Sequence, residues 1–524
     1  MATLKELNQK YIEIKKRHLG MGGEEALHKQ KAAKKLNVRE RLQRLLDAGS
    51  FTELGLLANH SSAESDLQGK DTPADGVVTG TGRIQGREVA IIAYDFTVIA
   101  GTIGAVGERK SKRIRELALK HKLPLVWLLD SAGARIQEIA SSRFAETGEM
   151  FFDQVMASGV IPQVAAVMGP CAAGTAYIPA LADFVPMVKG TSSMALAGPP
   201  LVKAAIGEDI SAEDLGGSKI HCAISGVADY EAQNDQECLE VVKKYLGFFP
   251  SHSGAKPSRK AKVEDEFSAL REELAKDDSI YQILPDSSQK PYDMKKIIAK
   301  IVDAGESLEL KEKFAPSLIT MLARIDGRSV GIVANQPLVM GGVIDVDASD
   351  KAARFINLCD SFNIPLLYLV DVPGFMVGSK VERAGIIRHG AKMLFATSQA
   401  TVPKLTVIIR KAYGAGYYVM CGKGYQPDLL VAWPSAEISL MGAEGAVNII
   451  FRKEIASSPD PEKKRSELVA QFKQRIDLDL AAQEGYIDDV IDPVDTRRVL
   501  IDALERCENK QVNLPKKKQG ILPV

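Results

Sequence analysis

Two short turns built from small residues are the part of this 524-residue chain best suited to chemistry. Residues 169–177 read Gly-Pro-Cys-Ala-Ala-Gly-Thr-Ala-Tyr and residues 410–417 read Arg-Lys-Ala-Tyr-Gly-Ala-Gly-Tyr, each after an apolar run expected to form a strand. Backbone N–H groups at such a turn, ahead of a helix, can stabilise negative charge on an oxygen atom. Small residues also let a carbonyl group approach the backbone. We therefore predict an oxyanion hole at each turn; the alternative is that alanine and glycine only permit tight helix–strand packing.

A second pair of loops ends two other apolar runs. Residues 130–138 read Asp-Ser-Ala-Gly-Ala-Arg-Ile-Gln-Glu, and residues 371–378 read Asp-Val-Pro-Gly-Phe-Met-Val-Gly. Ser131 is not expected to be a nucleophile, because the Gly-x-Ser-x-Gly elbow is incomplete and no paired histidine is apparent. Arg135 and Glu138 have the spacing of neighbours on a helix, so they can form an ion pair.

Other common catalytic devices are missing from the sequence. The seven histidines include no His-x-x-x-His pair, so we expect no protein-bound metal and interpret His221 and His389 as structural. A Walker phosphate loop is absent, and Gly80-x-Gly82 is interpreted as part of a β-hairpin. The six cysteines include no Cys-x-x-Cys pair, which indicates reduced, mostly buried thiols. The acid and base work is therefore expected from something the chain does not encode.

An internal repeat positions both turns and both loops. Lys-Leu-Pro-Leu-Val-Trp-Leu-Leu-Asp-Ser-Ala-Gly at 122–133 matches Asn-Ile-Pro-Leu-Leu-Tyr-Leu-Val-Asp-Val-Pro-Gly at 363–374. The same spacing holds for two further pairs of segments, 83–92 with 324–333 and 161–164 with 402–405. Strand and helix patterns alternate in both copies. This predicts two tandem α/β domains related by duplication.

The sequence between the repeated segments delimits the two copies. Residues 9–47 read mostly as helix, with charged residues around a leucine stripe. Residues 250–262, rich in proline, serine and lysine, read as a linker, and the second copy opens with a helix at Met294. We predict an N-terminal domain over residues 1–260 and a C-terminal domain over residues 261–524.

The composition is that of an ordinary globular protein. Hydrophobic residues make up 45% and charged residues 26%, and no apolar run is long enough to span a bilayer. Basic and acidic residues each number 67, so no net basic field indicates nucleic acid. The N-terminus resembles neither a signal nor a transit peptide. We expect a cytoplasmic protein with no nucleic-acid or membrane contact.

Three neighbouring basic residues could bind phosphate groups or form a solvated helix face: Lys110, Lys112 and Arg113.

Ordered motifs along nearly the whole chain identify a family. They include Leu-Asn-Val-Arg-Glu-Arg-Leu at 36–42, Asp-Phe-Thr at 95–97, the loops at 130–138 and 371–375, the turns at 169–174 and 410–414, Gly-Ile-Val-Ala-Asn-Gln-Pro at 331–337 and Gly-Ile-Ile-Arg-His-Gly-Ala-Lys at 385–392. On these motifs the chain resembles the carboxyltransferase (β) subunit of biotin-dependent acyl-CoA carboxylases, in the propionyl-CoA and methylcrotonyl-CoA carboxylase group.

The resemblance implies an architecture and a reaction. It implies two crotonase-like domains, the N-terminal one of one subunit holding the acyl-CoA and the C-terminal one of another holding biotin, at a dimer interface commonly inside a hexamer. The first turn would offer N–H groups to the thioester enolate and the second to the ureido oxygen of biotin. Biotin would also supply the base, which explains why no side-chain base was found. The implied donors are Ala173, Gly174, Ala415 and Gly416, and the implied substrate-binding residues are Gly133, Ala134, Arg135, Gly374, Phe375 and Tyr418.

Two departures from the family bear on the substrate. The family usually has Gly-Gly in the first turn, where this chain has Ala173 and Gly174, so an added methyl group crowds the acyl carbon. Tyr418 stands where propionyl-type members have aspartate, a position that influences acyl-chain preference. The bulky ring is our reason to expect an acyl group other than acetyl or simple propionyl. The sequence therefore leaves the acyl-CoA open.

The chain needs partners to complete a reaction cycle. It has no Ala-Met-Lys-Met-like biotin acceptor and no nucleotide-binding region of a biotin carboxylase. A biotin carboxylase and a biotin carboxyl carrier subunit are therefore implied. One alternative is the carboxyltransferase subunit of a biotin-dependent decarboxylase of glutaconyl- or methylmalonyl-type, which runs the same chemistry in reverse. Another is a non-catalytic CoA-binding scaffold, which the retention of both glycine-bearing turns disfavours.

Overall fold

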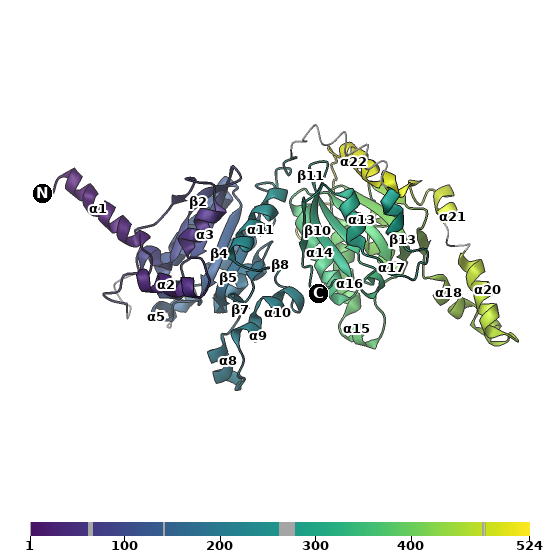
Figure 1. Ribbon diagram of the computed structural model, residues 1–524, viewed down its shortest axis with the longest axis horizontal. Coiled ribbons are helices and arrows are strands. Elements are labelled where there is room, and N and C mark those ends of the chain that lie inside the picture. Colours follow the sequence, from purple (N-terminus) through teal and green to yellow (C-terminus); the bar gives the residue numbers. More distant parts are fainter. Residues whose placement is uncertain are drawn as a thin grey trace. The chain divides into compact units, whose positions relative to one another are not determined.

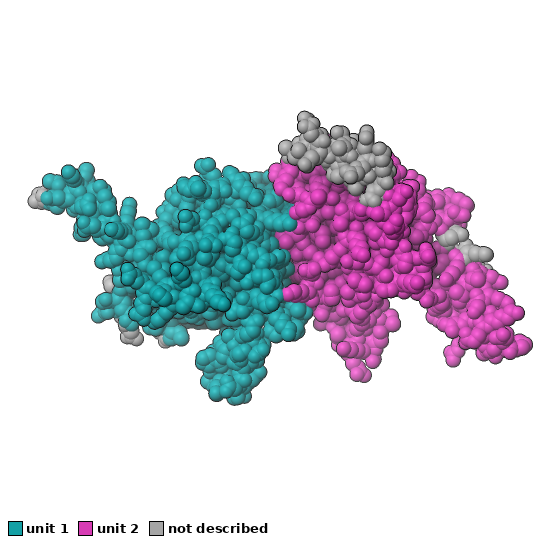
Figure 2. Space-filling view, in the orientation of Figure 1, with its two compact units in different colours: residues 1–256 teal, residues 257–524 magenta. Residues whose placement is uncertain are grey.

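The chain folds into two units, residues Met1–Lys256 (unit 1) and Pro257–Val524 (unit 2) (Figure 2). The computed structural model describes residues 2–60, 67–139, 142–260, 278–473, 476 and 478–523. Residues 250–260 of the predicted linker contain no helix or strand, and residues 261 and 262 lie outside the described ranges.

Unit 1 is a sheet covered by helices (Figure 1). Its strands are β1 (Thr52–Glu53), β2 (Val77–Ile84), β3 (Arg87–Tyr94), β4 (Leu125–Ser131), β5 (Gln163–Ala172), β6 (Pro186–Val188), β7 (Ser193–Ala195) and β8 (Tyr230–Ala232). Its helices are α1 (Leu4–Leu19), α2 (Glu24–Ala32), α3 (Val38–Leu45), α4 (Ala105–His121), α5 (Ile136–Ile139), α6 (Glu149–Ala157), α7 (Tyr177–Leu181), α8 (Pro199–Ile206), α9 (Ala212–Gly216), α10 (Ser218–Ala223) and α11 (Asp235–Phe248).

Unit 2 has the same plan. Its strands are β9 (Ser307–Leu310), β10 (Leu318–Ile325), β11 (Arg328–Asn335), β12 (Leu366–Val372), β13 (Lys404–Tyr413), β14 (Leu429–Ala432), β15 (Glu437–Ser439) and β16 (Asp489–Val490). Its helices are α13 (Met294–Ile301), α14 (Val346–Ser361), α15 (Ser379–Arg383), α16 (Ile386–Gln399), α17 (Gly414–Val419), α18 (Ala443–Ile450), α19 (Arg452–Ala456), α20 (Pro461–Lys473), α21 (Leu478–Gln483) and α22 (Thr496–Arg506).

The two sheets have the same strand order, which confirms the predicted duplication. Unit 1 runs β1-β2-β3-β4-β5-β6-β8 with β7 beside β5, and unit 2 runs β9-β10-β11-β12-β13-β14-β16 with β15 beside β13. In each sheet the first strands form an antiparallel hairpin and the later ones are parallel. The starts of β2 to β5 and of β10 to β13 keep the spacing of the sequence repeat, and β4 and β12 carry a register shift at the matching place. The repeat is therefore preserved in backbone register up to the end of β5 and β13.

The sheet of unit 1 is buried on both faces because its strands are continuous apolar runs. Along β4, Leu125, Trp127 and Leu129 lie in the core cluster with residues of α4 and α6. Val126 and Leu128 point to the opposite face, since side chains alternate along a strand, and both are fully buried as well. Helix α11 contacts α3, β5 and β6. The carboxyl ends of β3, β4 and β5 thus meet at one edge of a covered parallel sheet, where ligand sites in α/β proteins commonly lie.

The interpretation of Gly80-x-Gly82 as a hairpin is confirmed. Both glycines lie inside β2, which pairs in antiparallel register with β3. A Cβ atom on Gly80 would lie 2.2 Å from the Thr52 carbonyl oxygen. This glycine is therefore explained by the close approach of β1, and not by a phosphate loop.

A lysine of the helix after the hairpin, half-buried in unit 1 and buried in unit 2, hydrogen-bonds the segment before the hairpin. Lys110 of α4 donates to the carbonyls of Ala74 (2.7 Å) and Val77 (2.6 Å). Lys351, at the matching position of the repeat, donates to the carbonyls of Lys311, Phe314, Ala315 and Leu318. Burial lowers the pKa of Lys110 to about 8 and that of Lys351 to about 7. Lys110 is therefore a structural residue, which argues against a phosphate-binding role for it.

Lys351 should make stability depend on pH. The ordinary pKa of lysine is 10.5, so between pH 7 and 10.5 the unfolded chain binds more protons than the folded one, and the free energy of unfolding rises with pH. A tenfold difference in proton affinity is worth about 1.4 kcal/mol, so we expect the wild type to gain about 2 kcal/mol relative to Lys351→Met between pH 7 and pH 9. Urea unfolding of both proteins at each pH measures this difference. Parallel pH profiles would show that Lys351 stays charged in the folded protein.

Candidate active site

The first small-residue turn ends β5 and starts a helix whose first N–H groups have no side-chain cap. Ala173 opens the 3-10 helix η4 (Ala173–Ala176), which leads into α7. Ala173 has a φ of 55°, a left-handed conformation that disfavours a residue with a Cβ atom. Ala173 is exposed and Gly174 half-buried. The first N–H groups of this turn can therefore point at a ligand oxygen.

The second turn copies the first in backbone geometry. Gly414 follows β13 and has the same φ of 55° as Ala173. Helix α17 begins at Gly414, and again no side chain caps it. The register of the repeat pairs Gly414 with Ala173 and Ala415 with Gly174. The donors inferred by resemblance, Ala415 and Gly416, are thus one residue further along than a strict repeat would put them.

Gly416 has a packing reason to be glycine. It is buried, and a Cβ atom there would lie 2.8 Å from Val372 Cγ2 and 3.0 Å from the Cα atom of Gly374. Ala415, in contrast, is exposed. The N–H groups of Gly414, Ala415 and Gly416 all belong to the first turn of α17, so each lacks an acceptor within the helix. The small side chain at 416 serves the packing of α17 on β12, and the exposed donor at 415 is the better candidate for a ligand.

The structure brings the loop after β4 against the first turn. Gly133 has a φ of 98°, and a Cβ atom there would lie 2.8 Å from the Ala172 carbonyl oxygen and 3.5 Å from Ala173 Cβ. The neighbouring Ala134, half-buried, bridges to Ile103. Sequence reasoning named Gly133, Ala134, Ala173 and Gly174 separately, and they form one surface.

The equivalent loop in unit 2 lies against the second turn. Gly374 has a φ of 128° and lies beside Gly416. Phe375 bridges to Ile344 as Ala134 does to Ile103, and its ring covers Gly390 of α16. Gly374, Phe375 and the α17 turn are therefore one surface too.

Arg135 is placed differently from the expectation that it binds substrate. Its guanidinium is fully buried and lies 2.5 Å from Asp75 Oδ1 and 2.9 Å from Glu138 Oε1, and it also donates to the Thr102 carbonyl. The expected pair with Glu138 is present. Protein atoms accept hydrogen bonds on every side of the Arg135 guanidinium. The side chain therefore holds the 133–135 loop in place and does not face a ligand. Unit 2 lacks this clamp, since Met376 and Pro316 stand at the matching positions.

Sequence reasoning missed a buried charge cluster beneath the same edge. Asp130, at the end of β4, accepts hydrogen bonds from Lys35 (2.7 Å), Arg41 (2.9 Å) and Gln30 (3.1 Å). Arg41 also reaches Asp235 at 2.9 Å. The signal for it was the Leu-Asn-Val-Arg-Glu-Arg-Leu motif, which contains Arg41 but does not say what the arginine binds. In unit 2, Asp371 pairs with Arg410 at 3.0 Å.

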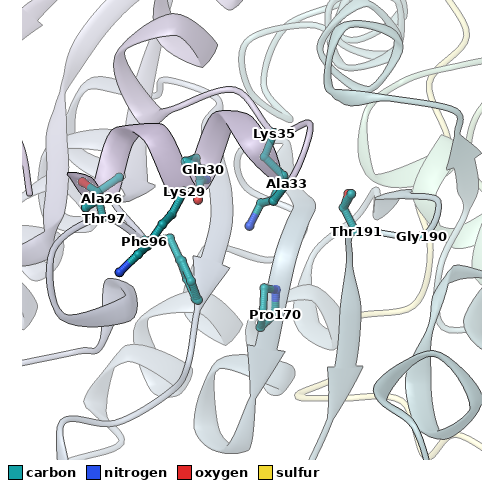
Figure 3. A pocket seen from close by; sticks show the side chains of 10 residues that line it. All are labelled: Ala26, Lys29, Gln30, Ala33, Lys35, Phe96, Thr97, Pro170, Gly190 and Thr191. Carbon is teal, nitrogen blue, oxygen red and sulfur yellow. The ribbon is translucent and has the colours of Figure 1, made fainter. Parts of the chain in front are cut away.

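A cavity of about 440 Å³ opens at this edge of unit 1 (Figure 3). Burial lowers the pKa of Lys35, whose ammonium lies 4.7 Å from the centre of the Phe96 ring. Lys29 of α2 is exposed and pairs with Glu25. The cavity combines an aromatic face, two ammonium groups and two hydroxyl groups. Its lining residues are Ala26, Lys29, Gln30, Ala33, Lys35, Phe96, Thr97, Pro170, Gly190 and Thr191.

Tyr418 lies one helical turn after the second turn's donors. Its side chain is 50% exposed. Its ring centre lies 6.1 Å from that of Tyr417 and 6.3 Å from that of Tyr425. A half-exposed tyrosine ring therefore stands near the start of α17, and its role in acyl preference stays a prediction.

The other candidate residues have structural partners. His221 contacts the Met194 carbonyl and Ser225, and His389 lies 2.8 Å from Asp350. Lys112 pairs with Glu149 at 2.6 Å. None of the six cysteines, all of which the structure describes, is disulfide-bonded, and five are buried. Over the described ranges, no group of three or more His, Cys, Asp or Glu residues could hold a metal ion. None of the described helices is long and apolar enough to cross a membrane.

Comparisons with known proteins agree with this architecture. The family described as carboxyl transferase domain matches residues 29–522. The methylmalonyl-CoA decarboxylase subunit alpha of Veillonella parvula is 45% identical over all of both chains. The propionyl-CoA carboxylase beta chain of Saccharopolyspora erythraea is 44% identical over 96% of this chain and 93% of the relative. A crystal structure of transcarboxylase 12S, described as a hexamer assembly with methylmalonyl-coenzyme A and methylmalonic acid bound, matches with a TM-score of 0.94 and 45% identity over 100% of this chain and 99% of that one.

The fold and the two turns define a crotonase-like carboxyltransferase, and the chain belongs to the carboxyl transferase family. It is an enzyme of the acyl-CoA carboxylase and transcarboxylase type, as expected from its motifs. The names of the three relatives describe decarboxylation, carboxylation and carboxyl transfer. Membership of the family therefore gives neither the direction of the reaction nor the acyl group.

Proposed function

We propose that this chain is the carboxyltransferase subunit that moves a carboxyl group between biotin on a partner protein and the α-carbon, or vinylogous γ-carbon, of an acyl-CoA. The observation that carries the proposal is the repetition of an uncapped, small-residue helix start at the same register of both units. Transfer of a carboxyl group between two enolisable groups needs negative charge stabilised on two oxygens, one on each. Biotin, when bound, supplies the carboxyl group and a basic nitrogen.

Unit 1 would hold the acyl-CoA. The N–H groups of Ala173 and Gly174 would donate to the thioester oxygen, with Gly133 and Ala134 beside them. The cavity lined by Lys29, Lys35 and Phe96 suits the nucleotide end of coenzyme A, because ammonium groups attract phosphate and an aromatic face can stack on a base. This cavity lies at the same sheet edge as the turn, since Pro170 in its wall is three residues before Ala173 on the same strand–turn segment.

Unit 2 would hold biotin. The first turn of α17 suits the ureido oxygen of biotin. No side chain caps the start of this helix, Ala415 is exposed, and the neighbouring residues are small. Helix starts favour negative charge on a bound oxygen. The donors we propose are Ala415 and Gly416, with Gly414 as the register equivalent of Ala173.

In unit 1, Arg135 acts through the 133–135 loop that it holds, and not through contact with substrate.

The partners follow from what the chain lacks. We propose a biotin carboxyl carrier and a biotin carboxylase as partners, and self-association into a dimer-based hexamer like the assembly described for transcarboxylase 12S.

A second candidate function is the same subunit in an acyl-CoA decarboxylase. The full-length similarity to the Veillonella parvula decarboxylase subunit favours that alternative. Its chemistry at the two turns would be the same, and only the partners would differ.

Transfer of labelled carboxylate to free biotin tests the proposal. The purified protein is given malonyl-, methylmalonyl-, ethylmalonyl-, glutaconyl- and methylglutaconyl-CoA, each labelled in the transferable carboxyl group. Transfer from at least one substrate supports the carboxyltransferase and identifies the acyl class. No transfer by folded protein, with or without a biotinylated carrier, would favour a CoA-binding scaffold instead.

Replacing Tyr418 should change the acyl preference. Aspartate, the residue of propionyl-type members, removes a ring about the size of several methylene groups, and a single methylene difference in a pocket changes kcat/KM by about 10-fold or more. We expect Tyr418→Asp to shift the kcat/KM ratio of methylmalonyl-CoA to larger substrates by at least about 10-fold, toward the larger substrates, because removing the ring leaves room for a longer acyl chain. Tyr418→Phe keeps the ring and should leave the ratio near that of the wild type. An unchanged ratio in Tyr418→Asp would remove this residue from the acyl site.

A further inference from the structure

Tyr177 of unit 1 is the repeat equivalent of Tyr418 of unit 2. The two tyrosines are separated by the same spacing that relates β5 to β13. The residue after each has a similar environment, because the Ile178 carbonyl accepts from Gln154 of α6 (2.7 Å) and the Val419 carbonyl accepts from Thr397 of α16 (3.1 Å). Both tyrosines therefore occupy the same place on the helix that follows a candidate oxyanion turn.

The helical position of Tyr177 directs its side chain back toward the first turn. In a helical segment the Cα–Cβ bonds tilt toward the N-terminus, so a residue covers the turn that precedes it. Tyr177 comes one turn after Ala173, and its backbone is helical, with φ −79° and ψ −22°. Its side chain is 48% exposed, so the core does not require the ring for packing.

A second aromatic ring near the first turn belongs to Phe151 of α6. Its ring meets that of Tyr177 edge to face, with centres 5.8 Å apart and planes at 76°. The same phenylalanine is the nearest neighbour of the open side of Gly174, where a Cβ atom would lie 3.7 Å from Phe151 Cζ. The Phe151 ring therefore bounds the space in front of Gly174 and has the Tyr177 ring packed against it, and among the described residues no other atom lies within 4 Å of that Cβ position. An apolar group held with its oxygen at the turn would lie against these rings.

We propose that Tyr177, backed by Phe151, is a specificity-determining residue that limits the length of the acyl chain in unit 1. The inference rests on the proposed function, because the ligand it describes is the acyl group of a CoA thioester. Tyr177 faces the chain from the acyl-CoA side and Tyr418 is its counterpart in unit 2. The ring, and not the hydroxyl group, sets the limit, since the contact with Phe151 is made by the ring.

The test compares substrates that differ by one methylene group. Carboxyl transfer to biotin is measured with malonyl-, methylmalonyl- and ethylmalonyl-CoA for the wild type, Tyr177→Ala and Tyr177→Phe. We expect Tyr177→Ala to raise the ethylmalonyl-to-malonyl ratio of kcat/KM by at least about 10-fold, and Tyr177→Phe to stay within about 3-fold of the wild type. Calorimetric binding of acetyl-, propionyl- and butyryl-CoA without biotin should show the same change in the ratio of Kd values. Tyr11→Ala, which removes a 51% exposed tyrosine on α1, is the matched control and should change neither ratio.

The outcomes separate this inference from the proposed function. If the wild type transfers carboxylate but Tyr177→Ala lowers all substrates equally and leaves the order of Kd values unchanged, the inference is wrong and the proposed function stands. If the wild type transfers none and binds no acyl-CoA, the proposed function fails. A changed preference in Tyr177→Phe as well as in Tyr177→Ala would assign the effect to the hydroxyl group and overturn the role of the ring.

Discussion

Proline at Gly174 lowers kcat for carboxyl transfer by about 100- to 1000-fold, whereas alanine at the same position keeps most of the activity. This is the expected result if the Gly174 N–H stabilises the thioester oxygen, because removal of one oxyanion donor has about that effect. Proline lacks the N–H group but is tolerated in the first turn of a helix, where that N–H has no acceptor within the helix.

Gly174→Ala is the matched control for the added side chain. Among the described residues, a Cβ atom there meets only Phe151 Cζ at 3.7 Å, an ordinary contact, and unit 2 already has alanine at the equivalent position 415. Single-turnover transfer to biotin measures kcat, and calorimetric acyl-CoA binding together with the thermal midpoint shows whether the variant is folded. Equal activity of the proline and alanine variants would mean that the Gly174 N–H does not act in catalysis.

Ala415→Pro makes the same test in unit 2. The preceding residue, Gly414, has no Cβ atom for the proline ring to meet, which removes one of the two clashes that restrict a residue before proline. Gly416→Pro is a poorer choice, because its Cβ atom would lie 2.8 Å from Val372 Cγ2. We expect Ala415→Pro to reduce transfer by about the same factor and to leave acyl-CoA binding intact. The two variants together then assign one turn to each substrate.

The second large effect is expected from Arg135→Met. The change leaves Asp75 and Glu138 buried without their counter-charge, and removal of one partner of a buried pair costs about 3–5 kcal/mol. Methionine itself fits this kind of loop, because Met376 stands at the same place in unit 2. We therefore expect the free energy of unfolding to fall by about that amount, as measured by urea unfolding.

The double variant Asp75→Asn/Arg135→Met separates charge from packing. Asn tolerates the positive φ of 52° at position 75, and it removes one of the two unpaired carboxylates, while Glu138 remains. We expect the double variant to be more stable than Arg135→Met alone. It should also regain part of the transfer activity, because the 133–135 loop carries Gly133 and Ala134 against the first turn. A double variant less stable than the single one would show that Arg135 acts by packing and not by charge.

The fold could be predicted from the sequence because its signals are local and repeated. Apolar runs of strand length, helical periodicity and turn residues recur at one fixed spacing, and two copies in one register leave little choice of architecture. The same signals identified the two turns and the loops after β4 and β12. They did not give the relative role of Gly414, Ala415 and Gly416, because a run of three small residues does not show which one lies against Val372.

What the sequence determined by itself is therefore the duplicated α/β architecture, the family and the segments that carry the chemistry. Only the tertiary structure decided what the charged residues do. Asp75 and Arg135 are 60 residues apart and Lys35 and Asp130 are 95 apart, and no periodic pattern joins them. Burial of an arginine such as Arg135 depends on whether an acidic partner reaches it in three dimensions. That is why the sequence could not show that Arg135 is buried against Asp75 and Glu138 and holds the 133–135 loop.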